Sequence, residues 1–345
     1  MLNKYKNLNL RAKEYFLNEL EKKSSLKRMN KYILNRCYKE IDILYDKGLL
    51  FIIEYLHKFK KFKNVHYYFS GSTNNLLLLY ILKLNDVNPI KYNLPHELFK
   101  EKNIKIELNE FFYEFLTYLN TLKDFRIIAG NFEKEDIEEI NKLEEGHYLL
   151  IPTGYSLDDM LFTLNNDGIF ETVDDYRIYK KDFITIKITK KSLLTQFKKI
   201  EVKNVINNQF ENEISDILKP KTIDHYVKIK SLAHGANVWK NNQDEIFKCG
   251  DIDKVIANRE DVYEYLLSHS IDKEIALQIL KFLSIDYRKK YLNIWHEYID
   301  LMKKHKCGDT FINIIKKINY ISTRGQAVSE CLFVLNKNNY INEEV

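Results

Sequence analysis

Apolar side chains recur at near-helical spacing through residues 10–60, and lysines and glutamates fill the positions between them. Tyr32, Ile33, Tyr38, Ile41 and Leu44 follow this spacing, which predicts an amphipathic helix. Glycine at position 48 interrupts the pattern, and residues 49–59 resume it. The first part of the chain is therefore expected to be helical.

The spacing changes between residues 66 and 190. A short aromatic strand at 66–69 precedes Ser70, Gly71 and Ser72, and a helix is expected at 76–84. Runs 104–108 and 184–188 alternate strictly between apolar and polar residues, so each strand would have one buried and one open face. Further strands are expected at 125–129 and 148–151, and helices at 109–123 and 134–144. These elements predict a mixed α/β unit.

Helical spacing returns in residues 200–345, where Pro220 marks an entry point. Residues 271–283 and 311–318 are amphipathic, and short polar breaks occur at His234-Gly235 and at Arg324-Gly325. We therefore predict three domains: a basic helical segment at 1–65, an α/β domain at 66–200 and a helical domain at 201–345.

Composition narrows the class of protein. The 345 residues are 45% hydrophobic, which is enough for a sizeable core, and ten glycines with four prolines exclude collagen-like and low-complexity designs. The four cysteines lie far apart without CxxC spacing, which fits a reducing compartment better than a disulfide framework or a zinc site. The longest apolar run, residues 76–82, is too short to span a bilayer. We expect a cytoplasmic protein without membrane contact.

The net charge of +5 is unevenly distributed. Residues 1–66 hold 16 basic and 7 acidic side chains, whereas acidic residues are in excess in the remainder. A basic segment can meet phosphate or an acidic partner, but ordinary solvated helix faces explain the same excess, and charge alone favours them. Lysines 58, 60, 61 and 63 interleave with phenylalanines 59 and 62, a pattern that fits either nucleic-acid binding or the exposed end of a helix.

Four runs occur in order along the chain: 70–72 with 85–89, 219–222 with 229–239, 259–266, and 316–327. In this order they resemble the polymerase core of bacterial DNA polymerase III alpha subunits of the PolC type, from about residue 35 to the C-terminus. The resemblance implies an α+β fold in which a nucleotidyltransferase-like, mixed-sheet palm at 66–200 follows the helical N-terminal segment. A helical, fingers-like domain would then occupy residues 201–345.

The departures from that family concern its metal site. Polymerase chemistry needs two divalent ions held by carboxylates, and the family's three aspartates correspond here to Lys105, Glu107 and Lys187. Alternate residues of a strand share a face, so Lys105 and Glu107 are expected together, and Lys187 would join them if the strands pair as in the family. The charges of such a cluster would largely neutralise one another, as in an abandoned metal site. The same residues could also be ordinary surface charges on a sheet, and this alternative predicts the same loss of catalysis. The resemblance thus implies a truncated, degenerate polymerase without a metal cofactor.

The candidate nucleotide- or DNA-binding residues are Gly71, Ser72, His234, Gly235 and Arg324. Gly71 and Ser72 can present backbone N–H groups to phosphate at a helix start, although a loop with a helix cap explains them too. Arg324 replaces a family lysine near the incoming nucleotide and can donate two parallel hydrogen bonds to phosphate. A histidine before glycine, such as His234, is equally well explained as a structural residue.

Three functions stay open at this point. The leading one is a degenerate, PolC-like protein of a mobile element or phage, which binds DNA weakly and without sequence preference, or binds replication proteins. The second is a minimal, magnesium-dependent DNA polymerase that uses carboxylates such as Glu107, Asp158, Asp159 or Asp182. The third is a protein-interaction module that mimics the polymerase core and touches no nucleic acid. Primer extension separates the second from the others, and salt-sensitive DNA binding separates the first from the third.

Overall fold

The computed structural model describes most of the helical regions and a set of strands in between. Of the strands β2 to β5, of Tyr67 and Tyr68 in β1 and of some helix positions, it describes the backbone alone. The described residues are 2–27, 29–62, 67–69, 71–99, 104–108, 125–130, 146–152, 185–190, 206, 209–240, 242–249 and 251–341.

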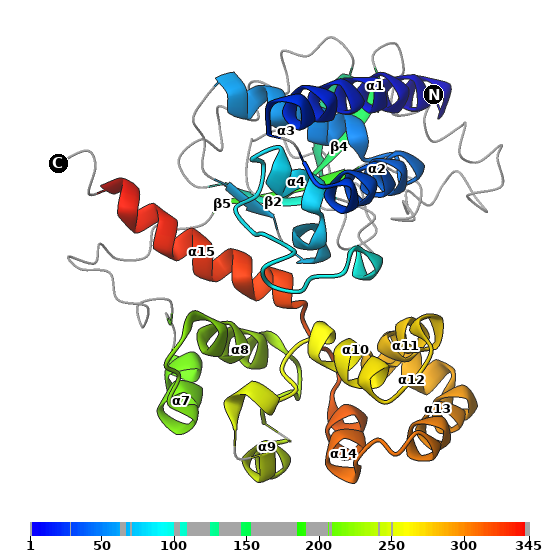
Figure 1. The fold of residues 1–345 in the computed structure, drawn as a ribbon, viewed down its shortest axis with the longest axis vertical. Coiled ribbons are helices and arrows are strands. Elements are labelled where there is room, and N and C mark those ends of the chain that lie inside the picture. Colours follow the sequence, from blue (N-terminus) through cyan, green and yellow to red (C-terminus); the bar gives the residue numbers. More distant parts are fainter. Residues whose placement is uncertain are drawn as a thin grey trace. The chain divides into compact units, whose positions relative to one another are not determined.

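The chain divides into two compact units (Figure 1). Unit 1 comprises Met1–Asn88 and Phe99–Leu193, and unit 2 comprises Pro89–Leu98 and Leu194–Val345. Residues 89–98 therefore belong to unit 2, although the chain on both sides of them belongs to unit 1. The finer, three-part division expected from the sequence stays a prediction.

Helices build the described core of unit 1. These elements are α1 (Leu2–Lys27), α2 (Lys31–Asp46), α3 (Leu50–Phe62), the 3-10 turn η1 (Gly71–Asn75) and the short α4 (Leu77–Ile81). Helix α2 begins after Asn30, whose side chain accepts a hydrogen bond from the Tyr32 N–H at 2.9 Å. The apolar faces of these helices bury Phe16, Ile41 and Phe51 in one core with their neighbours.

Backbone pairing in unit 1 joins five strands in the order β1-β2-β5-β4-β3. The strands are β1 (Tyr67–Phe69), β2 (Ile104–Leu108), β3 (Phe125–Gly130), β4 (Gly146–Pro152) and β5 (Thr185–Lys190). Only β2 and β5 run parallel among these neighbours, and their register sets Lys105 opposite Lys187. Each run that the sequence predicts as a strand overlaps one of these elements.

The predicted α+β class, with a mixed-sheet palm as its centre, is nevertheless wrong. Helix accounts for 73% of the residues described with their side chains, and strand for 1%. The described buried core of unit 1 comes from helices and turns, and strands contribute Phe69 alone. The alternating runs do form strands, but helices contribute most of the buried apolar side chains that the structure describes, so the described part of the chain is mainly helical.

The named elements described in unit 2 are helices and 3-10 turns, joined by loops, and the predicted amphipathic stretches 271–283 and 311–318 lie in helical segments. Helix α10 begins with a capping box, in which Asn258 and Asp261 each accept a hydrogen bond from the other's backbone N–H. Its helices are α7 (Gln209–Leu218), α8 (Ile223–His234), α9 (Gln243–Cys249), α10 (Arg259–Ser268), α11 (Lys273–Ile279), α12 (Ile285–Lys290), α13 (Leu292–Lys304), α14 (Asp309–Lys317) and α15 (Arg324–Ile341), with 3-10 turns η2 (His96–Leu98), η5 (Ile252–Lys254) and η6 (Leu280–Leu283).

Unit 2 has its own hydrophobic core, which includes Trp239, Val262, Phe282, Trp295 and Ile315. Among the described residues of the whole chain, no helix combines the length and the apolar character needed to cross a membrane.

Candidate functional site

Three of the sequence runs that resemble PolC meet in unit 2. The Ala236 N–H donates to the Tyr320 carbonyl at 2.9 Å, and the Asn319 N–H donates back to the Ala236 carbonyl at 2.9 Å. The Arg259 N–H donates to the Ser322 carbonyl, also at 2.9 Å. Runs 229–239, 259–266 and 316–327, distant in sequence, are therefore joined by backbone hydrogen bonds.

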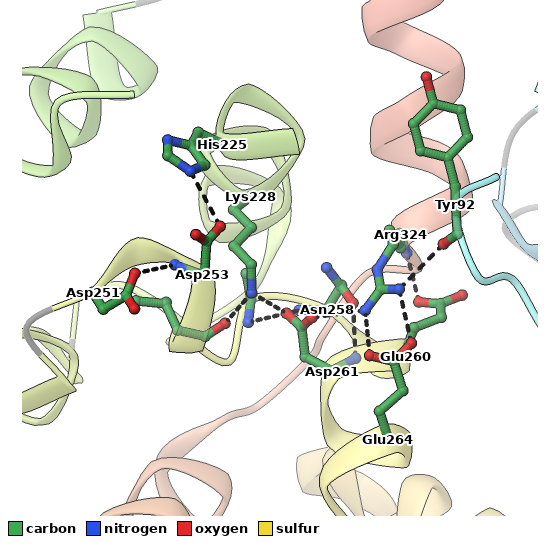
Figure 2. Close-up of polar contacts among 12 residues, drawn as sticks. Tyr92, His225, Lys228, Asp251, Asp253, Asn258, Glu260, Asp261, Glu264 and Arg324 are labelled. Atoms are coloured by element: carbon green, nitrogen blue, oxygen red, sulfur yellow. Dashed lines mark hydrogen bonds and ion pairs between the residues drawn. The ribbon is translucent and has the colours of Figure 1, made fainter. Parts of the chain in front are cut away.

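Charged side chains reinforce this junction (Figure 2). We call Lys228, Glu260, Asp261, Glu264 and Arg324 the Arg324 cluster. Lys228 comes from α8, the three carboxylates from α10, and Arg324 from the start of α15. The cluster thus connects three helices that belong to the three resembling runs or border them.

Both terminal nitrogens of Arg324 are engaged. Nη1 and Nη2 donate to the two carboxylate oxygens of Glu264 at 2.8 and 3.0 Å, a forked arrangement typical of strong arginine–carboxylate pairs. Nη2 also donates to Asp261 Oδ1 at 2.8 Å, and Nη1 to the Tyr92 carbonyl at 3.2 Å. Burial disfavours the charged form, but these carboxylates outweigh it and raise the pKa of Arg324 above its ordinary value.

Asp261 and Glu260 tie the cluster to the backbone. Asp261 Oδ2 accepts hydrogen bonds from the N–H groups of Ala257 at 2.8 Å and Asn258 at 3.2 Å, and from Lys228 Nζ at 3.3 Å. Glu260 Oε2 accepts from the Arg324 backbone N–H at 2.6 Å. Three carboxylates thus face two cations, so the cluster carries no surplus positive charge for phosphate.

Segment 89–98 is fastened to the same cluster. Besides the contact of the Tyr92 carbonyl with Arg324, Asn93 Nδ2 donates to Glu264 Oε1 at 2.7 Å. Glu97 pairs with Lys273 in the same unit. The Arg324 cluster therefore holds the segment that crosses from unit 1 into unit 2 and back, as well as the helices.

His234 lies at the end of α8 and forms an ion pair with Glu330 of α15, with Nε2 and Oε2 2.9 Å apart. The hydrogen bond to Glu330 raises the pKa of His234 and outweighs the opposing effect of burial. Gly235 follows as the helix cap, and a Cβ there would lie 2.1 Å from Val238 Cγ2. Packing therefore requires the glycine, whatever else the site does.

Gly71 and Ser72 belong to a different environment, in unit 1. Gly71 has a positive φ of 69°, which glycine adopts readily, and the Ser72 side chain is buried. The N–H of Leu78 in the first turn of α4 already donates to Glu40 Oε2 at 2.7 Å. Glu40 is fully buried and pairs with Arg36 at 2.9 Å, so a carboxylate stands where a phosphate would approach α4.

The structure thus brings His234, Gly235 and Arg324 into unit 2 and leaves Gly71 and Ser72 in unit 1; their role as binding residues stays a prediction. The side chains of Lys105, Glu107 and Lys187 lie outside the described residues, as do Ser70, Asp158, Asp159 and Asp182. Within the described part of the chain, no group of three or more histidine, cysteine or acidic residues is arranged to hold a metal ion.

Sequence reasoning missed the acidic partners of Arg324. Glu260, Asp261 and Glu264 belong to the run 259–266, which stands out by its resemblance and not by its charge. A signal for Asp261 is present, because an asparagine three residues before an aspartate is the spacing of a capping box. No local signal points from these residues to position 324.

The basic N-terminal region is only partly available for binding. Lys58 pairs with the buried Glu54 at 2.5 Å, and burial lowers the pKa of Lys60. Helix α2 presents a different set: Lys31 and Lys39 are exposed, and two exposed tyrosines lie between them in sequence. These tyrosines are Tyr32, 63% exposed, and Tyr38, 37% exposed. We call Lys31, Tyr32, Tyr38 and Lys39 the α2 face.

About a third of the chain is similar to DNA polymerase III of the PolC type. It is 35% identical over 113 residues to the protein of Caldanaerobacter subterraneus subsp. tengcongensis, a match that covers 32% of this chain and 8% of that protein. It is 31% identical over 129 residues to the Oceanobacillus iheyensis protein and 27% identical over 131 residues to that of Staphylococcus aureus. These matches cover 37% of this chain and 9% of each relative.

No protein-family model matches the chain. The similarity supports a relationship to PolC, and the matched part spans less than a tenth of the relatives' length. That the chain is a truncated and degenerate form of PolC stays a prediction.

Proposed function

We propose that this chain is a polymerase-derived protein that acts in DNA replication by binding DNA, and that it does not itself add nucleotides. The observation that carries the proposal is the similarity to PolC in three species. The backbone hydrogen bonds that join three of the PolC-like runs in one helical unit also support it, because runs that resembled PolC by chance would not be expected to contact one another.

The lack of nucleotide addition is supported by positions 105 and 187. The resemblance assigns metal-binding aspartates there, and this chain has lysines. The parallel register of β2 and β5 pairs the two positions directly. Two ammonium groups at paired positions oppose the binding of divalent cations, which nucleotidyl transfer requires.

Binding is supported by the α2 face and by the basic excess of residues 1–66. Lysines and exposed tyrosines together offer phosphate contacts and stacking surfaces to single-stranded DNA. Such binding is weak, tolerant of sequence and strongly reduced by salt, because release of counterions drives it.

The test combines binding and catalysis with the same purified protein. Fluorescence anisotropy with labelled single-stranded DNA across a salt series should show salt-dependent binding, and primer extension with magnesium or manganese should stay at background. The Lys31→Gln/Lys39→Gln variant should lower the salt slope by about 1.4, since each lost phosphate contact removes about 0.7 on single strands.

A matched control removes two lysines that are already paired, in the Lys13→Gln/Lys58→Gln variant, since Lys13 pairs with Asp42 at 2.7 Å and Lys58 with Glu54. Its salt slope should change much less. Absence of binding at low ionic strength would favour the protein-interaction module instead. Nucleotide incorporation that is lost in Glu107→Gln would favour the minimal polymerase.

A further inference from the structure

A pocket of about 280 Å³ lies beside the C-terminal end of α8 in unit 2. Phe210 of α7 lines it, and the other lining residues come from the stretch 233–240, which includes Asn237, Trp239 and Lys240. This stretch largely coincides with a run that resembles PolC, and it follows directly on α8. The pocket is therefore built almost entirely by one short segment.

The lining combines three kinds of chemistry. Phe210 is half-buried and supplies the accessible aromatic surface of the lining, whereas Trp239 is buried in the core of unit 2. The exposed Phe247 packs edge-on against Trp239 with ring centroids 6.1 Å apart. Lys240 places its ammonium group 5.8 Å from the Phe210 ring centroid. Among the described residues the Asn237 carboxamide has no hydrogen-bond partner, and it can both donate and accept.

This combination matches a nucleobase joined to a phosphate. A base has a flat face that stacks on aromatic rings, and its edge carries donors and acceptors that an amide can meet. A cation next to the aromatic surface suits the phosphate that follows the base. A purely apolar ligand would contact Phe210 but would form no hydrogen bond with Asn237 and no ion pair with Lys240.

The size of the pocket and the difference between single-stranded and duplex DNA define the proposed ligand further. A pocket of about 280 Å³ lies just below the usual range of small-ligand sites, about 300 to 1,000 Å³, so it has room for a base and not for a drug-sized molecule. Bases in a duplex are stacked and paired, so a base reaches such a pocket only from a single strand or a flipped position.

We propose that this pocket takes one unstacked base of single-stranded DNA, with Lys240 at a neighbouring phosphate. The proposal rests on the proposed DNA-binding function and adds the kind of DNA and the place where it is read. It differs from binding by the α2 face, because a pocket encloses a single base, whereas the lysines and tyrosines of that face contact phosphates and bases at an open surface.

The test compares two labelled oligonucleotides of equal length, a normal single strand and one whose residues are all abasic, by fluorescence anisotropy. Because stacking on an aromatic side chain favours a base by about 1–3 kcal/mol, which is about 5- to 150-fold, the wild-type protein should bind the normal strand at least about five-fold more tightly. Equal affinity for the two strands would overturn the pocket and leave the proposed DNA binding intact. No binding of either strand would overturn the proposed function itself.

Variants then assign the discrimination to this pocket. Ala236 is exposed and lines the pocket, so Ala236→Leu should fill it and reduce the preference to the part that the exposed tyrosines of the α2 face supply, while binding to the abasic strand persists. Asn237 has a φ of 59°, so Asn237→Gly removes the amide without straining the backbone and should also reduce the preference. Lys240→Gln should lower the salt slope by about 0.7.

Thermal melting checks that each variant is folded. Leu267, which is exposed on α10 and is not among the lining residues, supplies the control, and Leu267→Ala should keep the full preference. A preference for normal DNA that stays at the wild-type level in both folded pocket variants, Ala236→Leu and Asn237→Gly, would show that the base binds elsewhere, which would overturn the assignment.

Discussion

Each unit of the molecule ties distant segments together with an arginine–carboxylate pair, and the two pairs differ in their access to solvent. In unit 1, the Arg36 and Glu40 side chains are 9% and 0% exposed. In unit 2, the Arg324 and Glu264 side chains are 15% and 37% exposed. The carboxylate of the first pair is closed to solvent, whereas the carboxylate of the second is partly exposed.

The hydrogen bonds around the two arginine–carboxylate pairs also differ. Arg36 Nη2 donates to the Asn75 carbonyl at 2.8 Å, and Glu40 accepts from the Leu78 N–H, so the pair also completes the loop before α4. Burial raises the pKa of Glu40. Arg324 instead shares several carboxylates, which keep it charged. One pair therefore stabilises packing in a dry interior, while the other joins segments at a surface that water reaches.

The largest expected effect is that of Glu40→Gln. This change keeps the side-chain shape but removes the negative charge that pairs with the buried Arg36, which costs about 3 to 5 kcal/mol in the free energy of unfolding of unit 1. Both tryptophans of the chain, Trp239 and Trp295, belong to unit 2, so their fluorescence reports that unit alone. In urea unfolding, the transition followed by circular dichroism should therefore move to lower urea concentration, while the transition followed by tryptophan fluorescence should stay at the same concentration.

Glu14 is an exposed residue of α1, and Glu14→Gln serves as the control with little expected change. If the tryptophan transition moved together with the circular dichroism transition, the two units would unfold as one, and the comparison of separate pairs would fail.

Arg324→Ala should have a smaller effect, about 2 kcal/mol in the free energy of unfolding of unit 2, because Glu264, its forked partner, is partly solvated. The loss removes the forked contact to Glu264 and leaves Asp261 with less compensation. Tryptophan fluorescence during urea unfolding measures it directly. Arg324→Lys keeps the charge without the fork and should fall between the wild type and the alanine variant. An alanine variant as stable as the wild type would mean that the Arg324 cluster is not structural.

The smallest effect concerns the ion pair of His234 with Glu330, which joins α8 to α15. Because the folded pKa of His234 is raised above its ordinary 6.5, the stabilisation is fully present below pH 6.5 and is lost as pH rises through the folded pKa. Lys230 opposes the shift and Glu211 supports it. The melting temperature of His234→Gln should therefore lie below that of the wild type by a degree or two at pH 6, and the difference should shrink by pH 8.

His296, exposed on α13, supplies the matched control, and the melting temperature of His296→Gln should stay close to that of the wild type. A wild-type advantage that grows with pH would contradict the assigned direction of the His234 shift.

Local elements followed from the sequence because their causes are local. Apolar spacing predicted α2 and α3, strict alternation predicted the strands at 104–108 and near 184–188, and the polar break at His234-Gly235 ends α8. These features depend on periods of 2 and 3.6 residues, which a single strand or helix imposes on its own side chains. The predicted fold class was wrong because periodicity identifies each element without weighing how much core each buries.

The candidate site shows the same division between local and distant causes. His234, Gly235 and Arg324 could be singled out from their runs, but Glu264 as the partner of Arg324, and Glu40 as the group that faces the start of α4, could not. The sequence determines which residues are charged and which helix faces are apolar. Which charges meet is decided by tertiary packing, because ion pairs join residues that burial of those apolar faces brings together from distant parts of the chain.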